Sequence, residues 1–218
     1  MLICLTYKPK VISNMFGPKV LEVIESPMNG KLEVRQLGRD IYVTTGGLTQ
    51  SGGLINELWS KTFKKIPKEQ LANKRWLVLG LATGTVAKII AQKYSPVKIT
   101  GVEIDPVMLD IGQRYFELKQ IPHLEIINLD ARRYVLDAKG KFDVVLVDLY
   151  VGDQLPKFVY SLQFISGIRK ISQLAIFNHL FYDSGKKTKA EALVNQLKSV
   201  FPIIKLHREL TNLLVICG

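Results

Sequence analysis

Cysteine, histidine and long apolar runs are scarce in this 218-residue sequence. The two cysteines, Cys4 and Cys217, lie near opposite ends of the chain, which indicates neither a disulfide framework nor a metal site. The three histidines are isolated, and no spacing of ligand residues predicts a bound metal. No apolar run approaches the roughly 20 residues that a helix needs to cross a bilayer. We therefore expect no metal site and no membrane segment.

The first residues, MLICLTYKPKVISNMF, include a short apolar patch. No basic segment precedes this patch, and no small-residue cleavage site follows it, as a signal peptide would require. We therefore interpret residues 1–16 as part of the folded protein and expect a cytoplasmic location.

Acidic residues are few compared with basic ones: 19 Asp and Glu stand against 30 Lys and Arg, and the net charge is +11 at pH 7. Such a charge attracts polyanions, nucleic acid included. However, the lysines are scattered, their clusters (KTFKK, GKKTK) are short, and aromatic residues do not alternate with basic ones as on a nucleic-acid platform. We interpret the charge as a lysine-rich surface and do not expect a nucleic-acid partner.

Apolar strand segments alternate with helical segments from Lys74 onward. This alternation predicts a parallel sheet that is covered by helices on both faces. The chain ends in two strand segments, IIKLHREL and NLLVICG, which a tight turn at Thr211-Asn212 joins without a helix. The sequence therefore predicts an α/β fold with a doubly wound, mostly parallel, seven-stranded Rossmann-like sheet that closes in an antiparallel hairpin. This ending is typical of methyltransferase-like folds. The predicted strands are RWLVLG, KITGVEID, HLEIINLD, FDVVLVDLY, QLAIFNHL and the two of the hairpin.

The segment before this sheet predicts a small β domain over residues 1–52, followed by the Rossmann-like domain over 53–218. KLEVRQL and DIYVTT have the pattern of antiparallel strands, with Gly38-Arg39 as the turn between them. GGLTQSGG is predicted to be a glycine-rich loop, and LINELWSKTFKKI an amphipathic helix.

A strand–turn–helix unit at WLVLGLATGTVAKII predicts a nucleotide pocket over the carboxyl ends of the strands. A dinucleotide loop, G-x-G-x-x-G, would need a third glycine where Thr85 stands, whereas the spacing G-x-G-x-G matches Gly80, Ala82 and Gly84 with one alanine. Glu103 ends the next strand, where an acid that binds both ribose hydroxyls belongs. The loop therefore favours an adenosyl sulfonium over a dinucleotide, although these glycines also occur in turns that bind no ligand.

Acidic residues follow the next two strands as well. Asp130 can accept a hydrogen bond from an adenine amino group while the N–H of Ala131 donates to the ring, and Asp130 can also cap the helix that follows. We interpret Asp105, which stands before a proline, as a helix cap.

At the fourth strand, Asp148 can act as a general base or bind a substrate amine, but a capping or turn role explains it equally well. Tyr150 can offer its hydroxyl or a wall to the substrate. Asn178 can donate to a carboxylate or bind an amine.

Several stretches resemble spermidine synthases, the polyamine aminopropyltransferases. GVEIDPVMLDIGQRYF is similar to V-E-I-D-P-x-V…A-R-x-Y-F of that family, LDARRYV to its D-A/G-R-x-x-L/V, and KFDVVLVDLY to its Y-D-V-I-I-x-D. The run from Asn29 to Trp59 resembles its small N-terminal β domain and the segment that leads into the first helix. The resemblance covers about residues 20–216.

This resemblance implies that the chain binds S-adenosylmethionine, its decarboxylated form or methylthioadenosine, that it uses an amine as acceptor, and that it forms a homodimer. By position, it implies that Glu103 binds the ribose, Asp130 the adenine and Gln50 the aliphatic arm of the nucleoside. Asp148 would activate the amine.

The sequence departs from this family mostly on the amine side. Thr83 stands where the family's loop has an acid, and glycines follow Gln50 and Ser51 where the family has an acidic pair. Only Glu57, Asp148 and Asp153 remain to bind a polycation, which requires several carboxylates.

Three functions therefore stay open: aminopropyl transfer to an amine, methyl transfer from S-adenosylmethionine, and a non-catalytic homologue that only binds a ligand or partner. Methylation of nucleic-acid bases is not expected, because the Asn/Asp-Pro-Pro-Tyr turn that holds a base amino group is missing after the fourth strand.

Overall fold

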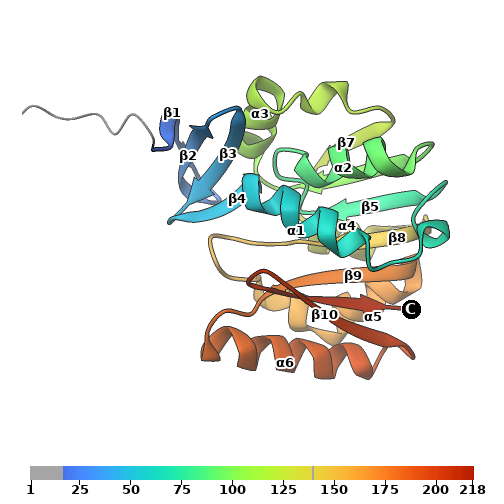
Figure 1. Ribbon diagram of the computed structural model, residues 1–218. Helices are drawn as coiled ribbons and strands as arrows, with labels where there is room; N and C mark the ends of the chain where they lie inside the picture. The colour runs from blue at the N-terminus through green and yellow to red at the C-terminus, as the bar shows by residue number, and fades with distance from the viewer. Residues whose placement is uncertain (1–16, 139) are drawn as a thin grey trace, which may run out of the picture.

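The computed structural model describes residues 17–138 and 140–218, which form two β-sheets (Figure 1). The smaller sheet is antiparallel and four-stranded, in the order β1-β2-β3-β4. Its strands are β1 (Lys19–Ser26), β2 (Gly30–Leu37), β3 (Asp40–Thr45) and β4 (Leu48–Gly52).

The larger sheet has seven strands in the order β10-β11-β9-β8-β5-β6-β7. Strands β5 to β9 pair in parallel, and β11 pairs antiparallel with both β9 and β10. The predicted fold class, a Rossmann-like sheet that ends in an antiparallel hairpin, is therefore confirmed. The strands are β5 (Arg75–Leu79), β6 (Lys98–Glu103), β7 (Leu124–Asn128), β8 (Phe142–Val147), β9 (Ser172–Leu180), β10 (Ile204–Glu209) and β11 (Asn212–Cys217).

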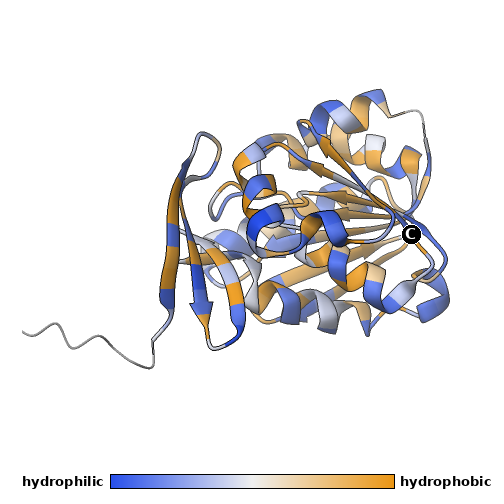
Figure 2. Ribbon diagram, turned by 90° about the horizontal axis from the view of Figure 1, so that it is seen from above, coloured by the Kyte–Doolittle hydropathy of each residue, from blue (hydrophilic) through white to orange (hydrophobic). Residues whose placement is uncertain are grey.

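Helices cover both faces of the larger sheet (Figures 1 and 2). Strand β8 is buried along Val144–Val147 because alternate side chains enter two separate cores. One core includes residues of α1 and α2, the other residues of α4, α5 and α6. The helices are α1 (Gly53–Phe63), α2 (Thr85–Tyr94), α3 (Pro106–Tyr115), α4 (Ala131–Asp137), α5 (Leu162–Ile171) and α6 (Ser184–Lys198), with 3₁₀ turns η1 (Lys68–Gln70), η2 (Leu118–Gln120) and η3 (Lys157–Tyr160).

The smaller sheet packs on α3 through a third apolar cluster. Leu32 and Val34 alternate inward along β2 and meet Met108 and Ile111 of α3. Asp105 adds a polar connection: its fully buried carboxylate caps α3 through Val107 and accepts hydrogen bonds from Ser26 Oγ and Asn29 Nδ2, both at 2.6 Å. The predicted capping role of Asp105 is confirmed. The predicted domain division after residue 52 stays a prediction, although β4 ends and α1 begins there.

Two predicted local structures were wrong. Leu48–Gly52 is a strand and not a loop, since its backbone pairs with β3; this pairing overrides the weak strand propensity of glycine, serine and glutamine. The final hairpin turns at Leu210 and Thr211 rather than at Thr211-Asn212. Asn212 already belongs to β11, where its Nδ2 donates to Asn178 Oδ1 at 2.8 Å.

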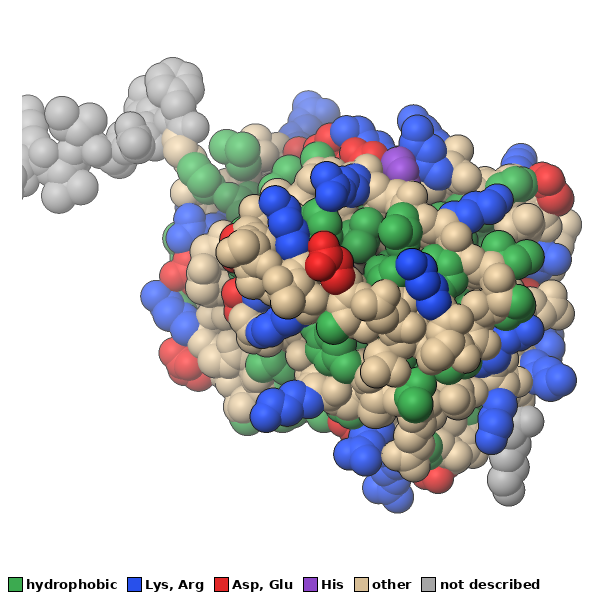
Figure 3. Space-filling model, turned by 90° about the horizontal axis from the view of Figure 1, so that it is seen from below, with side chains coloured by type: hydrophobic (Ala, Val, Ile, Leu, Met, Phe, Trp, Pro, Cys, Tyr) green, Lys and Arg blue, Asp and Glu red, His purple; other side chains and the backbone are tan. Residues whose placement is uncertain are grey.

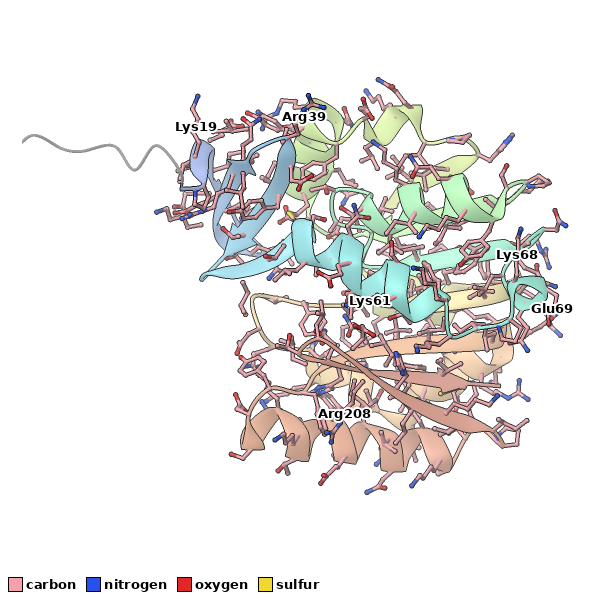
Figure 4. All side chains as sticks on the ribbon, in the orientation of Figure 1. Lys19, Arg39, Lys61, Lys68, Glu69 and Arg208 are labelled. Atoms are coloured by element: carbon pink, nitrogen blue, oxygen red, sulfur yellow. The ribbon has the colours of Figure 1, made fainter. Side chains whose placement is uncertain are left out.

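Basic side chains are dispersed over the molecule. Lys and Arg are scattered over the face in Figure 3. In Figure 4, Lys19 and Arg39 lie on the smaller sheet, whereas Lys68 and Arg208 lie at distant places on the larger domain. Within residues 17–138 and 140–218, no helix has the length and apolarity needed to cross a membrane. The predictions for residues 1–16, Cys4 included, lie outside the described residues, whereas Cys217 is buried without a disulfide.

Candidate functional site

A cavity of about 560 Å³ lies over the carboxyl ends of the parallel strands. Strand β4 and helix α1 line one side of it, and the segments that follow β5, β6, β7 and β8, together with the end of β9, line the other. All the predicted site residues except Gly84 line this cavity: Gln50, Gly80, Ala82, Glu103, Asp130, Ala131, Asp148 and Tyr150.

Strand register explains why residues so distant in sequence meet there. Leu79 of β5 is level with Val147 of β8, so the next residues, Gly80 and Asp148, leave the sheet side by side. Glu103 pairs with Asn128 at the end of β6 and β7. The carboxyl ends of parallel strands form one edge. Glu103 is the last residue of β6, and Asp130 and Asp148 follow β7 and β8.

Glycine is required at position 80 by both conformation and space. Its φ of +87° lies in the left-handed region, and a Cβ atom would stand 2.1 Å from the carbonyl oxygen of Asp148. Gly84 precedes α2 with a φ of +92°, but a Cβ there would meet Leu118 in the core. Gly84 therefore shapes the loop without facing the cavity.

The Glu103 carboxylate forms the centre of the nucleoside side. One oxygen accepts from the backbone N–H of Ala82 at 2.7 Å and the other from that of Asp105 at 2.9 Å. Ala82 has a φ of +49°, which directs its N–H to Glu103 and away from a ligand. Each oxygen keeps a lone pair for a second donor, as two ribose hydroxyls would require. Burial raises the pKa of Glu103, and its backbone donors oppose this effect.

The position of Asp130 is compatible with both predicted roles, helix capping and adenine binding. Its Oδ1 caps α4 by accepting from the N–H of Arg133 at 2.9 Å, and the residue also lines the cavity. Ala131 is the first residue of α4, so its N–H has no carbonyl partner within the helix. An acceptor and a donor thus lie next to each other beyond β7.

Asp148 is held by two side-chain donors. Trp59 Nε1 of α1 donates to one oxygen at 3.0 Å, and Asn178 Nδ2 of β9 donates to the other at 2.8 Å. Asn178 is oriented in turn by Asn212. Desolvation raises the pKa of Asp148, and the bonds from Asn178 and Trp59 act in the opposite direction. Both donors to the Asp148 carboxylate are side chains, and neither is a backbone N–H of a helix or turn. The hydrogen bonds therefore do not support the alternative capping role.

Tyr150 lines the cavity, but its hydroxyl is bound to the backbone of β9. Its hydroxyl donates to the Asn178 carbonyl at 3.1 Å and accepts from the Leu180 N–H at 2.8 Å, so β9 occupies it. Burial raises the pKa of Tyr150 well above its ordinary value. Two roles were predicted for Tyr150, a hydroxyl donor or a wall of the cavity. Since the hydroxyl is already bound, only the role of a wall is compatible with the structure.

Strand β4 closes the cavity from the side of the smaller sheet. Gln50 Nε2 donates to the Gly152 carbonyl at 3.1 Å, and this bond spans from β4 to the segment after β8. Ser51 Oγ accepts from the N–H of Thr83 at 3.3 Å, which fixes β4 on the glycine loop. Thr83 is fully buried and does not line the cavity, so the position that carries an acid in spermidine synthases does not face the cavity in this chain.

The acids expected on the amine side lie elsewhere. Glu57 binds Lys61, which Figure 4 labels on α1, at 2.7 Å, and Asp153 binds Lys186 at 2.7 Å. Neither acid lines the cavity. Among the described residues, the cavity is lined by the carboxylates of Glu103, Asp130 and Asp148 and by no Lys, Arg or His. The described residues contain no group of three metal-ligating side chains.

Trp59 and Asn212 were not predicted as site residues. In a single sequence, a helical tryptophan that also donates a hydrogen bond looks the same as one that only packs, and Asn212 was predicted as a turn residue. Asn178 carried a weak signal as an amide at the end of an apolar strand. Its amide donates to the carboxylate of Asp148, and its contact with a ligand stays a prediction.

Comparison with known proteins identifies relatives of two kinds. A family described as a methyltransferase domain matches residues 77–161. A probable polyamine aminopropyl transferase of Bifidobacterium longum is 30% identical over 128 residues, which are 57% of this chain and 28% of that protein. An eEF1A lysine and N-terminal methyltransferase homolog of Drosophila melanogaster is 30% identical over 163 residues, 68% of this chain and 24% of that protein. The chain thus spans about a quarter of the length of these relatives.

Solved structures agree on the fold. A probable spermidine synthase from Corynebacterium glutamicum superposes with a TM-score of 0.71 at 16% identity, covering 92% of this chain and 79% of the other. Human methyltransferase-like protein 13 in complex with SAH gives a TM-score of 0.62 at 23% identity, covering 75% of this chain and 81% of the other. The chain has the methyltransferase-like fold of these structures, and part of its sequence is similar both to polyamine aminopropyltransferases and to methyltransferases.

Proposed function

We propose that the chain is an aminopropyltransferase, which binds decarboxylated S-adenosylmethionine in the cavity and transfers its aminopropyl group to an amine. The observation that carries this proposal is the charge of the cavity. In a chain of net charge +11, the described lining has three carboxylates and no basic side chain. Such a lining attracts cations and offers no ionic partner to an anion.

The choice between the two sulfonium compounds follows from this charge. Decarboxylated S-adenosylmethionine carries a sulfonium and an ammonium, both positive. Intact S-adenosylmethionine adds a carboxylate, which would face Glu103 and Asp148 without a cationic side chain among the described residues of the lining. Burying an unpaired charge is costly.

The nucleoside would occupy the half of the cavity over β5, β6 and β7. Glu103 would accept from both ribose hydroxyls, with Asp130 and Ala131 beside the adenine and Gln50 next to the aliphatic arm. The acceptor amine would lie next to Asp148, over β8 and β9.

Transfer would be an in-line displacement. The amine nitrogen attacks the aminopropyl carbon next to sulfur, and the C–N bond forms while the C–S bond breaks. The electron pair of that bond stays on sulfur, which leaves as neutral methylthioadenosine, and Asp148 takes the proton that the amine loses. The sulfonium is already an activated leaving group, so the protein contributes mainly positioning and proton transfer.

Methyl transfer from intact S-adenosylmethionine is the second candidate. It is supported by the Drosophila relative, a methyltransferase homolog that is 30% identical over 68% of this chain. The same pocket would hold the nucleoside, and the carboxylate would then need backbone donors.

Calorimetric titration tests the nucleoside preference. We expect decarboxylated S-adenosylmethionine to bind at least about tenfold more tightly than the intact compound, a difference of about 1.4 kcal/mol. A Glu103→Gln variant, which keeps the shape of the side chain, should weaken the binding of both. Tighter binding of the intact compound would favour methyl transfer, and binding of neither would overturn both candidates.

Replacing Trp59 should change the pH profile of transfer. Since the bond from Trp59 stabilises the ionised form of Asp148, a Trp59→Phe variant should raise the pKa of this carboxyl further. The base form is then reached only at higher pH, so we expect the acidic limb of the kcat–pH profile to move upward. Phe63→Leu is the matched control, because Phe63 packs on Trp59 in the same core without a polar contact to Asp148. An unchanged acidic limb in Trp59→Phe would contradict the role of Asp148 as the base.

A further inference from the structure

We infer that the acceptor of this site is a monoamine with an apolar body, such as an alkylamine or arylalkylamine, rather than a diamine or polyamine. The inference rests on the proposed aminopropyl transfer and specifies its second substrate. It is carried by the composition of the acceptor half, the part of the cavity over β8, β9 and β11.

Asp148 is the only acid among the described residues that line the acceptor half. The residues around it are mostly apolar and come from α1, from the segment after β8 and from the end of β9 and the final hairpin turn: Leu54, Leu58, Tyr150, Phe158, Leu180 and Leu210. This one carboxylate would have to serve both the ammonium of the donor and the proton that the acceptor amine loses. It leaves no charge for a second acceptor ammonium, and the remainder of the acceptor would contact hydrocarbon.

The apolar lining continues to the mouth of the cavity. Leu54, Val151 and Leu210 line the cavity and are 59%, 44% and 46% exposed. Exposed apolar side chains that gather at one cavity mark a ligand-binding surface. They come from three separate segments, namely α1, the loop after β8 and the hairpin turn. An apolar acceptor that entered between them would cover this surface.

A second ammonium would have no partner in this chamber. Two further acids, Glu57 and Asp153, stand close in sequence to residues that line the cavity. They are bound to Lys61 and Lys186 and do not line it themselves. The ammonium at the far end of a diamine would lose its hydration against leucine and phenylalanine side chains, which is unfavourable without a counter-charge.

Paired substrates of equal length test this inference. We expect a higher kcat/KM for pentylamine than for 1,5-diaminopentane, and for butylamine than for 1,4-diaminobutane, by about tenfold or more, with phenylethylamine also accepted. The assay is mass-spectrometric detection of the aminopropylated amine, with decarboxylated S-adenosylmethionine as donor.

A substitution that adds a carboxylate should reverse the preference. Leu54→Asp places an acid at the cavity mouth and in the first turn of α1, where a negative charge is favourable for the helix. We expect it to raise the diamine-to-monoamine ratio of kcat/KM about tenfold or more. Leu206→Asp is the matched control: Leu206 is 53% exposed on β10 and does not line the cavity, so the ratio should not change.

Different results would contradict the monoamine acceptor and the aminopropyl transfer on which it rests. Preference of the wild-type chain for diamines, or an unchanged ratio in Leu54→Asp with a folded protein, would overturn the monoamine inference alone. Absence of transfer to every amine, with decarboxylated S-adenosylmethionine still bound in calorimetry, would overturn the proposed aminopropyl transfer and the inference that rests on it.

Discussion

Replacing Asp148 with asparagine is expected to lower kcat for aminopropyl transfer by about 10²–10⁴-fold, the usual contribution of a general base. An asparagine cannot take the proton that the attacking amine loses. The nucleoside contacts lie over β5 to β7, so the affinity for methylthioadenosine, measured by calorimetry, should stay within about threefold of that of the wild type, less than about 0.7 kcal/mol. A split between kcat and ligand affinity separates a catalytic role of Asp148 from a structural one.

The hydrogen bonds of Asp148 define the control for this experiment. In Asp148→Asn the side-chain oxygen can still accept from Asn178, but the new amide group would face the N–H of Trp59, another donor. The double variant with Trp59→Phe removes this conflict and should fold at least as well as Asp148→Asn while remaining inactive. Activity near that of the wild type in either variant would exclude Asp148 as the base.

The variant's residual activity carries further information. Without a base, transfer depends on the fraction of amine that is already deprotonated in solution. The residual rate of Asp148→Asn should therefore rise with pH up to the pKa of the free amine. A residual rate that is independent of pH would indicate that the amine loses its proton elsewhere.

Gly80→Ala should be the most damaging single substitution in the glycine loop. The new methyl group would stand 2.1 Å from the carbonyl oxygen and 2.8 Å from the carbonyl carbon of Asp148, and the residue's φ of +87° adds backbone strain. Because these neighbours are backbone atoms, relief requires β5 and β8 to separate where the N–H of Asp148 donates to Leu79. We expect a loss of at least about 3 kcal/mol of unfolding free energy from strain and overpacking together.

Thermal unfolding measures this effect, and the expected loss corresponds to a decrease in Tm of roughly 6 °C or more. Gly47→Ala is the matched control, since Gly47 has a similar φ of +81° and no atom within 4 Å of the added Cβ. This control should lose only the cost of the left-handed conformation, about 1–2 kcal/mol. Equal losses in the two variants would show that conformation alone, and not the contact with Asp148, makes glycine necessary at position 80.

Much of the site was predictable because it follows from local patterns. Apolar strands that alternate with helices specify a parallel sheet, and the residues that end these strands must meet at one edge. Gly80, Glu103, Asp130 and Asp148 were placed by this rule, and all four line the cavity. The rule could not identify the edge strand β4, because its glycine-rich sequence becomes a strand only through pairing with β3.

The chemical state of the side chains could not be read from the sequence. Asp148 and Tyr150 follow the same strand, yet Asp148 is held at the cavity by Trp59 and Asn178, whereas the hydroxyl of Tyr150 is bound to the backbone of β9. Likewise, Glu57 and Asp153 are predicted to serve the amine site, but in the structure they form ion pairs with Lys61 and Lys186. These distinctions depend on contacts between segments far apart in the chain.

The sequence by itself determined the alternation of strands and helices in the larger sheet, the class of that sheet, and the edge at which a nucleoside would bind. These features depend on apolar periodicity and on glycine positions, which are local properties of the chain. Only the tertiary structure decided which acids face the cavity, which donors orient Asp148, and that the acceptor half is apolar. The orientation of a side chain is set by the partners that packing brings to it, and those partners come from distant segments.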